Sequence, residues 1–139
     1  MSIARILNDD ELDDTAKAVF ADIRATRGTD FINNFWRVLA HDSALLERTW
    51  TSLKAVMAPG ALDPLTKELL YVAVSATNGC EYCVRSHTAA ARAKGASEAQ
   101  LMEVMAVVGM ANQTNALATA VQVPIDPLFM TPVIKGSDT

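Results

Sequence analysis

Apolar side chains recur along most of this chain at intervals of three and four residues, the spacing of one face of an α-helix. A first stripe lies within residues 10–26 and ends near Gly28. Similar stripes predict helices over 30–40, from Asp42 or Ser43 to Pro59-Gly60, over 64–77, over about 80–94 and over 98–111. Residues 111–121 either continue the last helix or form another. No strand-like alternation stands out, so the pattern predicts an all-α fold, a helical bundle of about six or seven helices.

Residues that start and stop helices support these boundaries. Asp63 suits the N-cap of a helix and Pro64 its first position. Proline is tolerated there because the N–H that it lacks would have no partner within the helix. Asn78-Gly79 is expected to end that helix, with glycine taking the left-handed conformation. Ser97 and Gln100 have the spacing of a capping box, which predicts a helix start at this point.

Length and composition predict one domain spanning residues 1–139. Half of the residues are hydrophobic and the net charge is −4, without a dense basic patch, so we expect no nucleic-acid partner. There is no apolar run of about 18 residues, so a membrane span is not expected. The first ten residues lack the hydrophobic region of a signal peptide, which predicts a cytoplasmic protein.

The chain's two cysteines lie in the octet Cys80-Glu81-Tyr82-Cys83-Val84-Arg85-Ser86-His87. On a helix, His87 lies one turn after Cys83, so the two side chains share a face with Cys80. In a reducing cytosol such a pair favours redox or metal chemistry over a static disulfide. The positive end of the helix favours Cys80 as the nucleophile, whereas a neighbouring histidine base favours Cys83. Spacing leaves this choice open.

Glu68 borders the apolar stripe of the preceding helix, and two interpretations are open. Partial burial would raise the pKa of Glu68 towards neutrality, and the carboxyl group would then relay protons to a thiol and an imidazole. Alternatively, Glu68 pairs with a surface Lys or Arg.

Two further alternatives concern the cysteine pair. A zinc site made of Cys80, Cys83, His87 and Glu68 has acceptable ligand types but little sulfur. The two cysteines could also be inert, buried thiols.

The spacing of Glu68, Cys80, Cys83 and His87, with the surrounding residues of about 50–115, resembles the alkylhydroperoxidase D-like branch of the carboxymuconolactone decarboxylase superfamily. The resemblance implies a peroxidase in which Cys83 attacks a hydrogen or organic peroxide and Cys80 then forms a disulfide with it. His87 and Glu68 would assist deprotonation of Cys83. An external dithiol, on a lipoyl group or a thioredoxin-like protein, would restore the thiols. The resemblance also implies a homo-oligomer, a trimer or a hexamer, and we expect no metal or other cofactor.

One position departs from the family's pattern. Tyr82 stands between the cysteines, where the best-studied branch has a second histidine. Tyr82 is a candidate for lining the site, but it is a poor base at neutral pH. Two other functions stay open: a carboxymuconolactone decarboxylase-like enzyme, which would not depend on the cysteine pair, and a non-enzymatic redox sensor.

Overall fold

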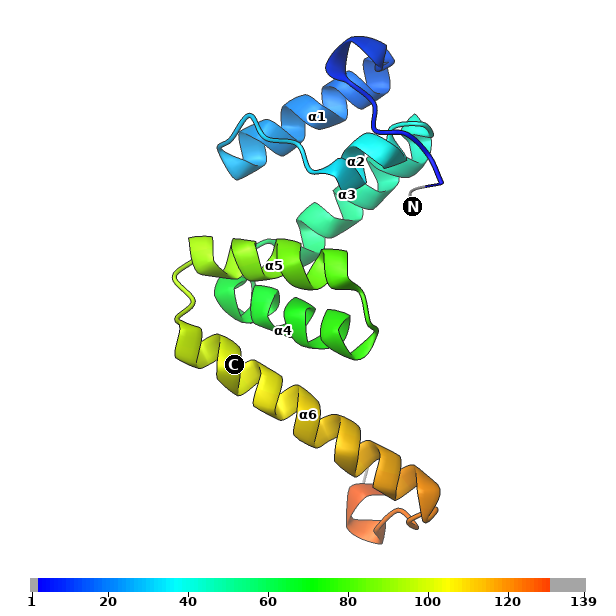
Figure 1. Cartoon of the computed structure of the whole chain (residues 1–139), viewed down its shortest axis with the longest axis vertical. Coiled ribbons are helices and arrows are strands. Elements are labelled where there is room, and N and C mark those ends of the chain that lie inside the picture. The colour runs from blue at the N-terminus through cyan, green and yellow to red at the C-terminus, as the bar shows by residue number, and fades with distance from the viewer. Residues whose placement is uncertain (1–2, 131–139) are drawn as a thin grey trace, which may run out of the picture. The chain divides into compact units, whose positions relative to one another are not determined.

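The computed structural model describes residues 3–130, and within this range all regular secondary structure is helical, without strands. Its elements, shown in Figure 1, are η1 (Asp9–Glu11), α1 (Asp14–Arg27), α2 (Asn34–Leu39), α3 (Ser43–Met57), α4 (Pro64–Thr77), α5 (Glu81–Ala93), α6 (Glu98–Ala120) and η2 (Pro127–Met130). The predicted all-α class is therefore confirmed. None of the helices in residues 3–130 combines the length and the apolar character needed to cross a membrane.

The chain divides into two compact units, Met1–Pro64 and Leu65–Thr139. The first contains α1 to α3, and the second contains α4 to α6 with all the candidate site residues. The expectation of a single domain over residues 1–139 stays a prediction.

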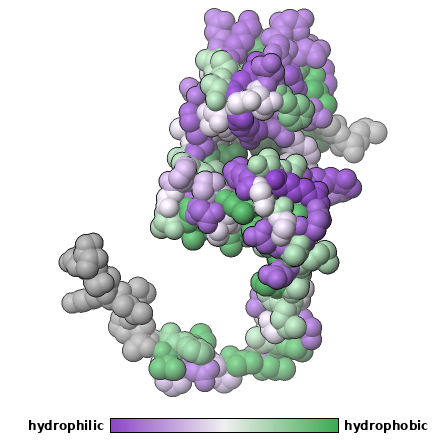
Figure 2. Space-filling view, turned by 90° about the vertical axis from the view of Figure 1, so that its left-hand side faces the viewer, coloured by the Kyte–Doolittle hydropathy of each residue, from purple (hydrophilic) through white to green (hydrophobic). Residues whose placement is uncertain are grey.

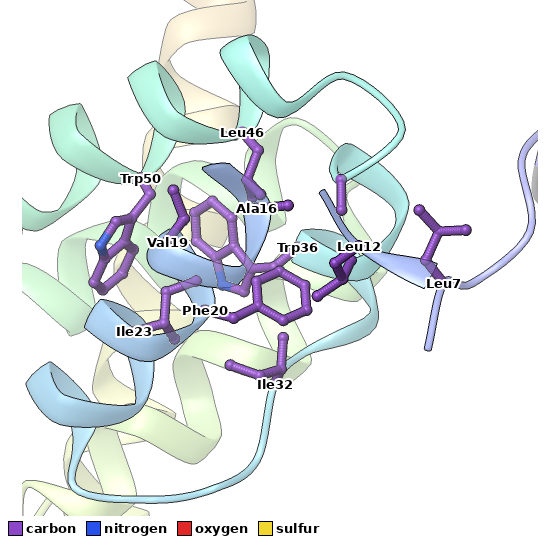
Figure 3. Packing of buried hydrophobic residues seen from close by; sticks show 11 residues of the cluster. Leu7, Leu12, Ala16, Val19, Phe20, Ile23, Ile32, Trp36, Leu46 and Trp50 are labelled. Carbon is purple, nitrogen blue, oxygen red and sulfur yellow. The ribbon is translucent and has the colours of Figure 1, made fainter. Parts of the chain in front are cut away.

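The core of the first unit is built around two tryptophans. Trp36 is 2% exposed, and its ring meets that of Trp50 edge to face, with centroids 5.5 Å apart. The guanidinium of Arg27 lies over both rings, a cation–π arrangement. Figure 3 shows how α1, α2 and α3 converge on this cluster, which comprises Leu7, Leu12, Ala16, Val19, Phe20, Ile23, Ile32, Trp36, Ala40, Leu46 and Trp50.

Two large apolar residues within the predicted helix ranges, 30–40 and Asp42 to Pro59, lie outside this core. Phe31 is 66% exposed because α2 begins only at Asn34, so the helical period assumed over 30–40 does not apply to it. Val56 is 64% exposed. It lies ten residues after the buried Leu46, which places it roughly 80° away around the helix.

Local sequence signals set the helix boundaries in the second unit. α4 begins at Pro64 and ends at Thr77, and Gly79 follows with a φ of 70°, as expected for a left-handed residue. The Ser97–Gln100 capping box is present in both directions at the start of α6. α6 continues to Ala120, so residues 111–120 extend this helix and do not form another.

Candidate active site

The turn between α4 and α5 places the two cysteines. The backbone N–H of Cys80 donates to the carbonyl of Ser75, at 2.9 Å, which ties the start of α5 to the end of α4. Gly79 allows the chain to reverse here because its positive φ is accessible without strain. Cys80 becomes the N-cap of α5, and Cys83 lies in the first turn of this helix.

The two free thiols interact with each other, and the interaction separates their acidities. Cys80 Sγ accepts a hydrogen bond from the Cys83 backbone N–H, at 3.3 Å, in the manner of an N-capping side chain. Hydrogen bonds from the Cys83 thiol and from this N–H lower the pKa of Cys80. Burial, followed by the hydrogen bond and charge of Cys80, raises the pKa of Cys83 to about 11. The first negative charge of the pair therefore belongs to Cys80, as the helix-end effect predicts.

We expect the reduced dithiol to titrate in two separated steps, the first with a lowered pKa and the second with a pKa of about 11. As the pH rises from 6 to 9, iodoacetamide should modify Cys80 before Cys83, because only the thiolate reacts. Thiolate absorbance at 240 nm measures the two steps, and peptide mapping identifies the alkylated residue. Faster modification of Cys83 would contradict this assignment.

Glu68 and His87 form a buried pair between α4 and α5. The distance from His87 Nδ1 to Glu68 Oε2 is 2.7 Å, and the two side chains are 17% and 7% exposed. The other carboxylate oxygen, Oε1, accepts from Lys94 Nζ, at 2.9 Å. Lys94 is the C-cap of α5, so both hydrogen-bonding partners of Glu68 come from the same helix.

The predicted rise in the pKa of Glu68 is wrong. Burial is the largest single effect and does raise the pKa, but the hydrogen bonds and charges of His87 and Lys94 together lower it below its usual value. The alternative prediction, a pair between Glu68 and a Lys or Arg, is confirmed by Lys94. Glu68 is therefore an ionised acceptor at neutral pH rather than a carboxylic acid that exchanges protons.

Tyr71 is the site residue that sequence reasoning missed. Its ring stacks on that of His87, with centroids 3.6 Å apart and planes 18° apart. Burial raises the pKa of Tyr71, and charges on Cys83, Cys80 and Glu68 act in the same direction. Tyr71 thus lies near both halves of the site, the dithiol and the Glu68–His87 pair. The sequence carried one signal for this role: Tyr71 lies one helical turn after Glu68 on α4, so the two side chains share a face.

The four candidate catalytic residues thus form two pairs. The thiols of Cys80 and Cys83 interact with each other, and His87 interacts with Glu68 and Tyr71. Cys80 also lines an open surface hollow, together with Ser75, Ala76, Gly79, Glu81, Val84 and Arg85. Tyr82 is 45% exposed, more than any of the four. Within residues 3–130, no group of three or more His, Cys, Asp or Glu residues is arranged to hold a metal ion.

Comparison with known proteins gives the family. The model of the carboxymuconolactone decarboxylase family matches residues 44–126, which include every candidate site residue. The chain belongs to this family.

Individual members are also similar to the chain. It is 44% identical over 52 residues to "Uncharacterized protein 4 in cox locus" of Paracoccus denitrificans, covering 37% of this chain and 47% of the relative. It is 41% identical over 73 residues to "Alkyl hydroperoxide reductase AhpD" of Solibacter usitatus, covering 52% of this chain and 40% of the relative. The chain therefore spans less than half the length of these two curated relatives.

A solved structure of the same family superposes over nearly the whole chain. It is the crystal structure of an alkylhydroperoxidase AhpD core from Rhodospirillum rubrum, 58% identical, with a TM-score of 0.92. The match covers 94% of this chain and 98% of the other. It confirms the predicted fold and the resemblance to the alkylhydroperoxidase D-like branch, so a peroxidase-like or carboxymuconolactone decarboxylase-like function is supported in general terms.

Proposed function

We propose that this protein is a thiol-dependent peroxidase that reduces hydrogen peroxide or organic peroxides through Cys80 and Cys83. The observation that carries the proposal is the hydrogen-bonded pair of free thiols at the start of α5, on the same two helices as the buried Glu68–His87 pair. The 58% identity to an alkylhydroperoxidase AhpD core supports it.

In the proposed reaction Cys83 is the attacking residue. Its sulfur bonds to one peroxide oxygen as the O–O bond breaks, which leaves a sulfenic acid on Cys83 and releases an alcohol or water. Because the pKa of Cys83 is raised to about 11, this step needs a base, and we assign the base to His87, oriented by Glu68. The thiol proton passes to His87 and then to the departing oxygen.

Cys80 completes the cycle as the resolving residue. Its lowered pKa makes it the better second nucleophile, so its thiolate attacks the Cys83 sulfur. The S–O bond breaks, and the hydroxide leaves as water after taking up a proton. The disulfide is then reduced by two electrons from an external dithiol, on a lipoyl group or a thioredoxin-like protein. Cys80 lines the open hollow, which offers this donor access.

A turnover assay tests the proposal directly. Purified protein is incubated with hydrogen peroxide or an organic hydroperoxide and with either dihydrolipoamide or reduced thioredoxin as electron donor. We expect peroxide loss to match dithiol oxidation one for one and to require the protein, and mass spectrometry should detect a Cys80–Cys83 disulfide. A disulfide that forms without repeated turnover would contradict the proposal and favour a redox sensor.

Family membership also supports a second candidate, a carboxymuconolactone decarboxylase-like reaction. That chemistry would not depend on the dithiol. Activity on a carboxylated lactone that persists when both cysteines are changed to serine would favour it over the peroxidase.

We also propose that further copies of the chain cover α6, in a trimer or a hexamer. Residues 104–120 of this helix carry no charged side chain. Met102, Val107, Met110 and Leu117 are each more than half exposed, and they lie within roughly 140° of one another around the helix, on one broad face. Figure 2 shows green and pale surface, with purple patches between, toward the lower end of the view. An exposed apolar face of this breadth is expected to be covered, and its lack of charge favours an equally uncharged copy of the same helix.

A further inference from the structure

Both oxygens of the Glu68 carboxylate are engaged, each by a different partner on α5. Oε1 accepts from Lys94 Nζ, at 2.9 Å, and Oε2 is 2.7 Å from His87 Nδ1. The Glu68 side chain is only 7% exposed, so hydrogen bonds from the two partners replace most of those that water would make to the carboxylate. A buried carboxylate held in this way has one orientation rather than several.

Lys94 is well placed for this contact because of how α5 ends. It lies seven residues, or two helical turns, after His87, so both side chains project from the same face. The backbone N–H of Lys94 donates to the last carbonyls of the helix, and Gly95 follows with a φ of 93°. The lysine backbone is thus fixed, and its side chain is 38% exposed where it reaches Glu68.

The charge state of Glu68 decides which nitrogen of neutral His87 carries the proton. An ionised carboxylate only accepts, so Nδ1 must donate to it and Nε2 keeps its lone pair. A protonated Glu68 could donate to Nδ1 instead, which would leave the proton on Nε2 and remove the base. Burial alone drives Glu68 towards this protonated form, and the hydrogen bonds from His87 and Lys94, with the charge of Lys94, oppose it.

We infer that Lys94 is a positioning residue: its ammonium keeps Glu68 ionised and oriented, so that neutral His87 holds its proton on Nδ1 and presents Nε2 as the proton acceptor. The role rests on the proposed peroxidase function, in which His87 is the base for Cys83. Lys94 itself touches neither the thiols nor a peroxide in this scheme.

The other groups around this pair fit the inference. From α4, the Tyr71 ring stacks on His87 and restricts its rotation, and its raised pKa keeps the phenol neutral. From the start of α5, Cys80 and Cys83 contribute the negative charge that acts on Tyr71. Among the residues that the structure describes, the ion-pair partners of Glu68 are His87 and Lys94, and the inference concerns the charge that Lys94 supplies.

Lys94→Met tests this role because methionine keeps most of the length of the side chain and removes its charge. Lys94→Arg restores the charge, and Arg92→Met is the matched control. It removes one positive charge two residues away, from an exposed pair with Glu98. Nitrogen-15 spectra of the His87 ring report the tautomer, and a carbon-13 titration of the Glu68 carboxyl reports its pKa.

We expect the wild type, Lys94→Arg and Arg92→Met to show His87 protonated on Nδ1 with a low Glu68 pKa. In Lys94→Met the Glu68 pKa should rise, the share of the Nε2-protonated tautomer should increase, and kcat/KM for peroxide should fall about tenfold or more, as is typical when an orienting partner is lost. Lys94→Met spectra identical to those of the wild type would overturn the inference, even in an active peroxidase. Shifted spectra in a protein that shows no peroxide turnover would support the positioning role and refute the proposed function.

Discussion

Changing Trp36 to alanine is expected to lower the free energy of unfolding by about 4 kcal/mol, the cost typical of removing a buried aromatic side chain. Trp36 is 2% exposed and meets Phe35 and Trp50 edge to face, with ring centroids 4.9 Å and 5.5 Å away. Its loss would leave a cavity between α1, α2 and α3 that the remaining side chains fill only in part. Urea unfolding at a fixed protein concentration measures the effect, followed by the fluorescence of the remaining tryptophan, Trp50.

Phe35→Ala is the matched control for this change. Phe35 is the neighbouring aromatic on α2, but it is 44% exposed, so less of its surface leaves water on folding. We expect its loss to cost about 1 kcal/mol. Equal losses for the two variants would show that burial of the Trp36 ring is not what stabilises this unit.

The two ends of α4 and the start of α6 could be predicted from the sequence because the signals that set them are local. The proline at the start of α4, the glycine after it and the capping box of α6 each act within a few residues. The all-α class follows from the same kind of information, since the three-to-four spacing of apolar residues is a property of each helix alone.

The electrostatics of the site could not be predicted in this way, because they depend on residues far apart in sequence. Partial burial of Glu68 is one of the two interpretations that the sequence leaves open, but the direction of its pKa shift depends on His87 and Lys94, which lie 19 and 26 residues away. The stacking of Tyr71 on His87 also requires α4 and α5 to lie side by side. A position beside an apolar stripe predicts desolvation, whereas the sign of a pKa shift needs the identity of the partner.

Changing Cys83 to serine is expected to lower the rate of peroxide reduction with a dithiol donor by at least about a thousandfold, as is typical when a nucleophile is removed. A serine hydroxyl cannot attack the O–O bond at neutral pH, and no sulfenic acid can form at this position. The coupled assay with dihydrolipoamide measures the loss, and circular dichroism checks that the variant is folded.

Cys80→Ser is the informative comparison, because it should block a later step. Cys83 can still be oxidised in this variant, but no second thiol is available to form the intrachain disulfide. Peroxide treatment should therefore produce a sulfenic acid on Cys83, which dimedone traps and peptide mapping locates. Repeated turnover should fall strongly, whereas one equivalent of peroxide should still be consumed.

The strongest alternative to the proposed mechanism exchanges the two roles, so that Cys80 attacks the peroxide and Cys83 resolves. The acidity of the two thiols favours this alternative. Cys80 has the lowered pKa and lines the open hollow, so it reacts first with any reagent that selects the thiolate alone. Cys83 becomes the peroxide-reactive residue only if His87 accepts its proton during the attack. A sulfenic acid trapped on Cys80 in the Cys83→Ser variant, formed at the wild-type rate, would therefore reverse the two roles and leave His87 without its proposed function.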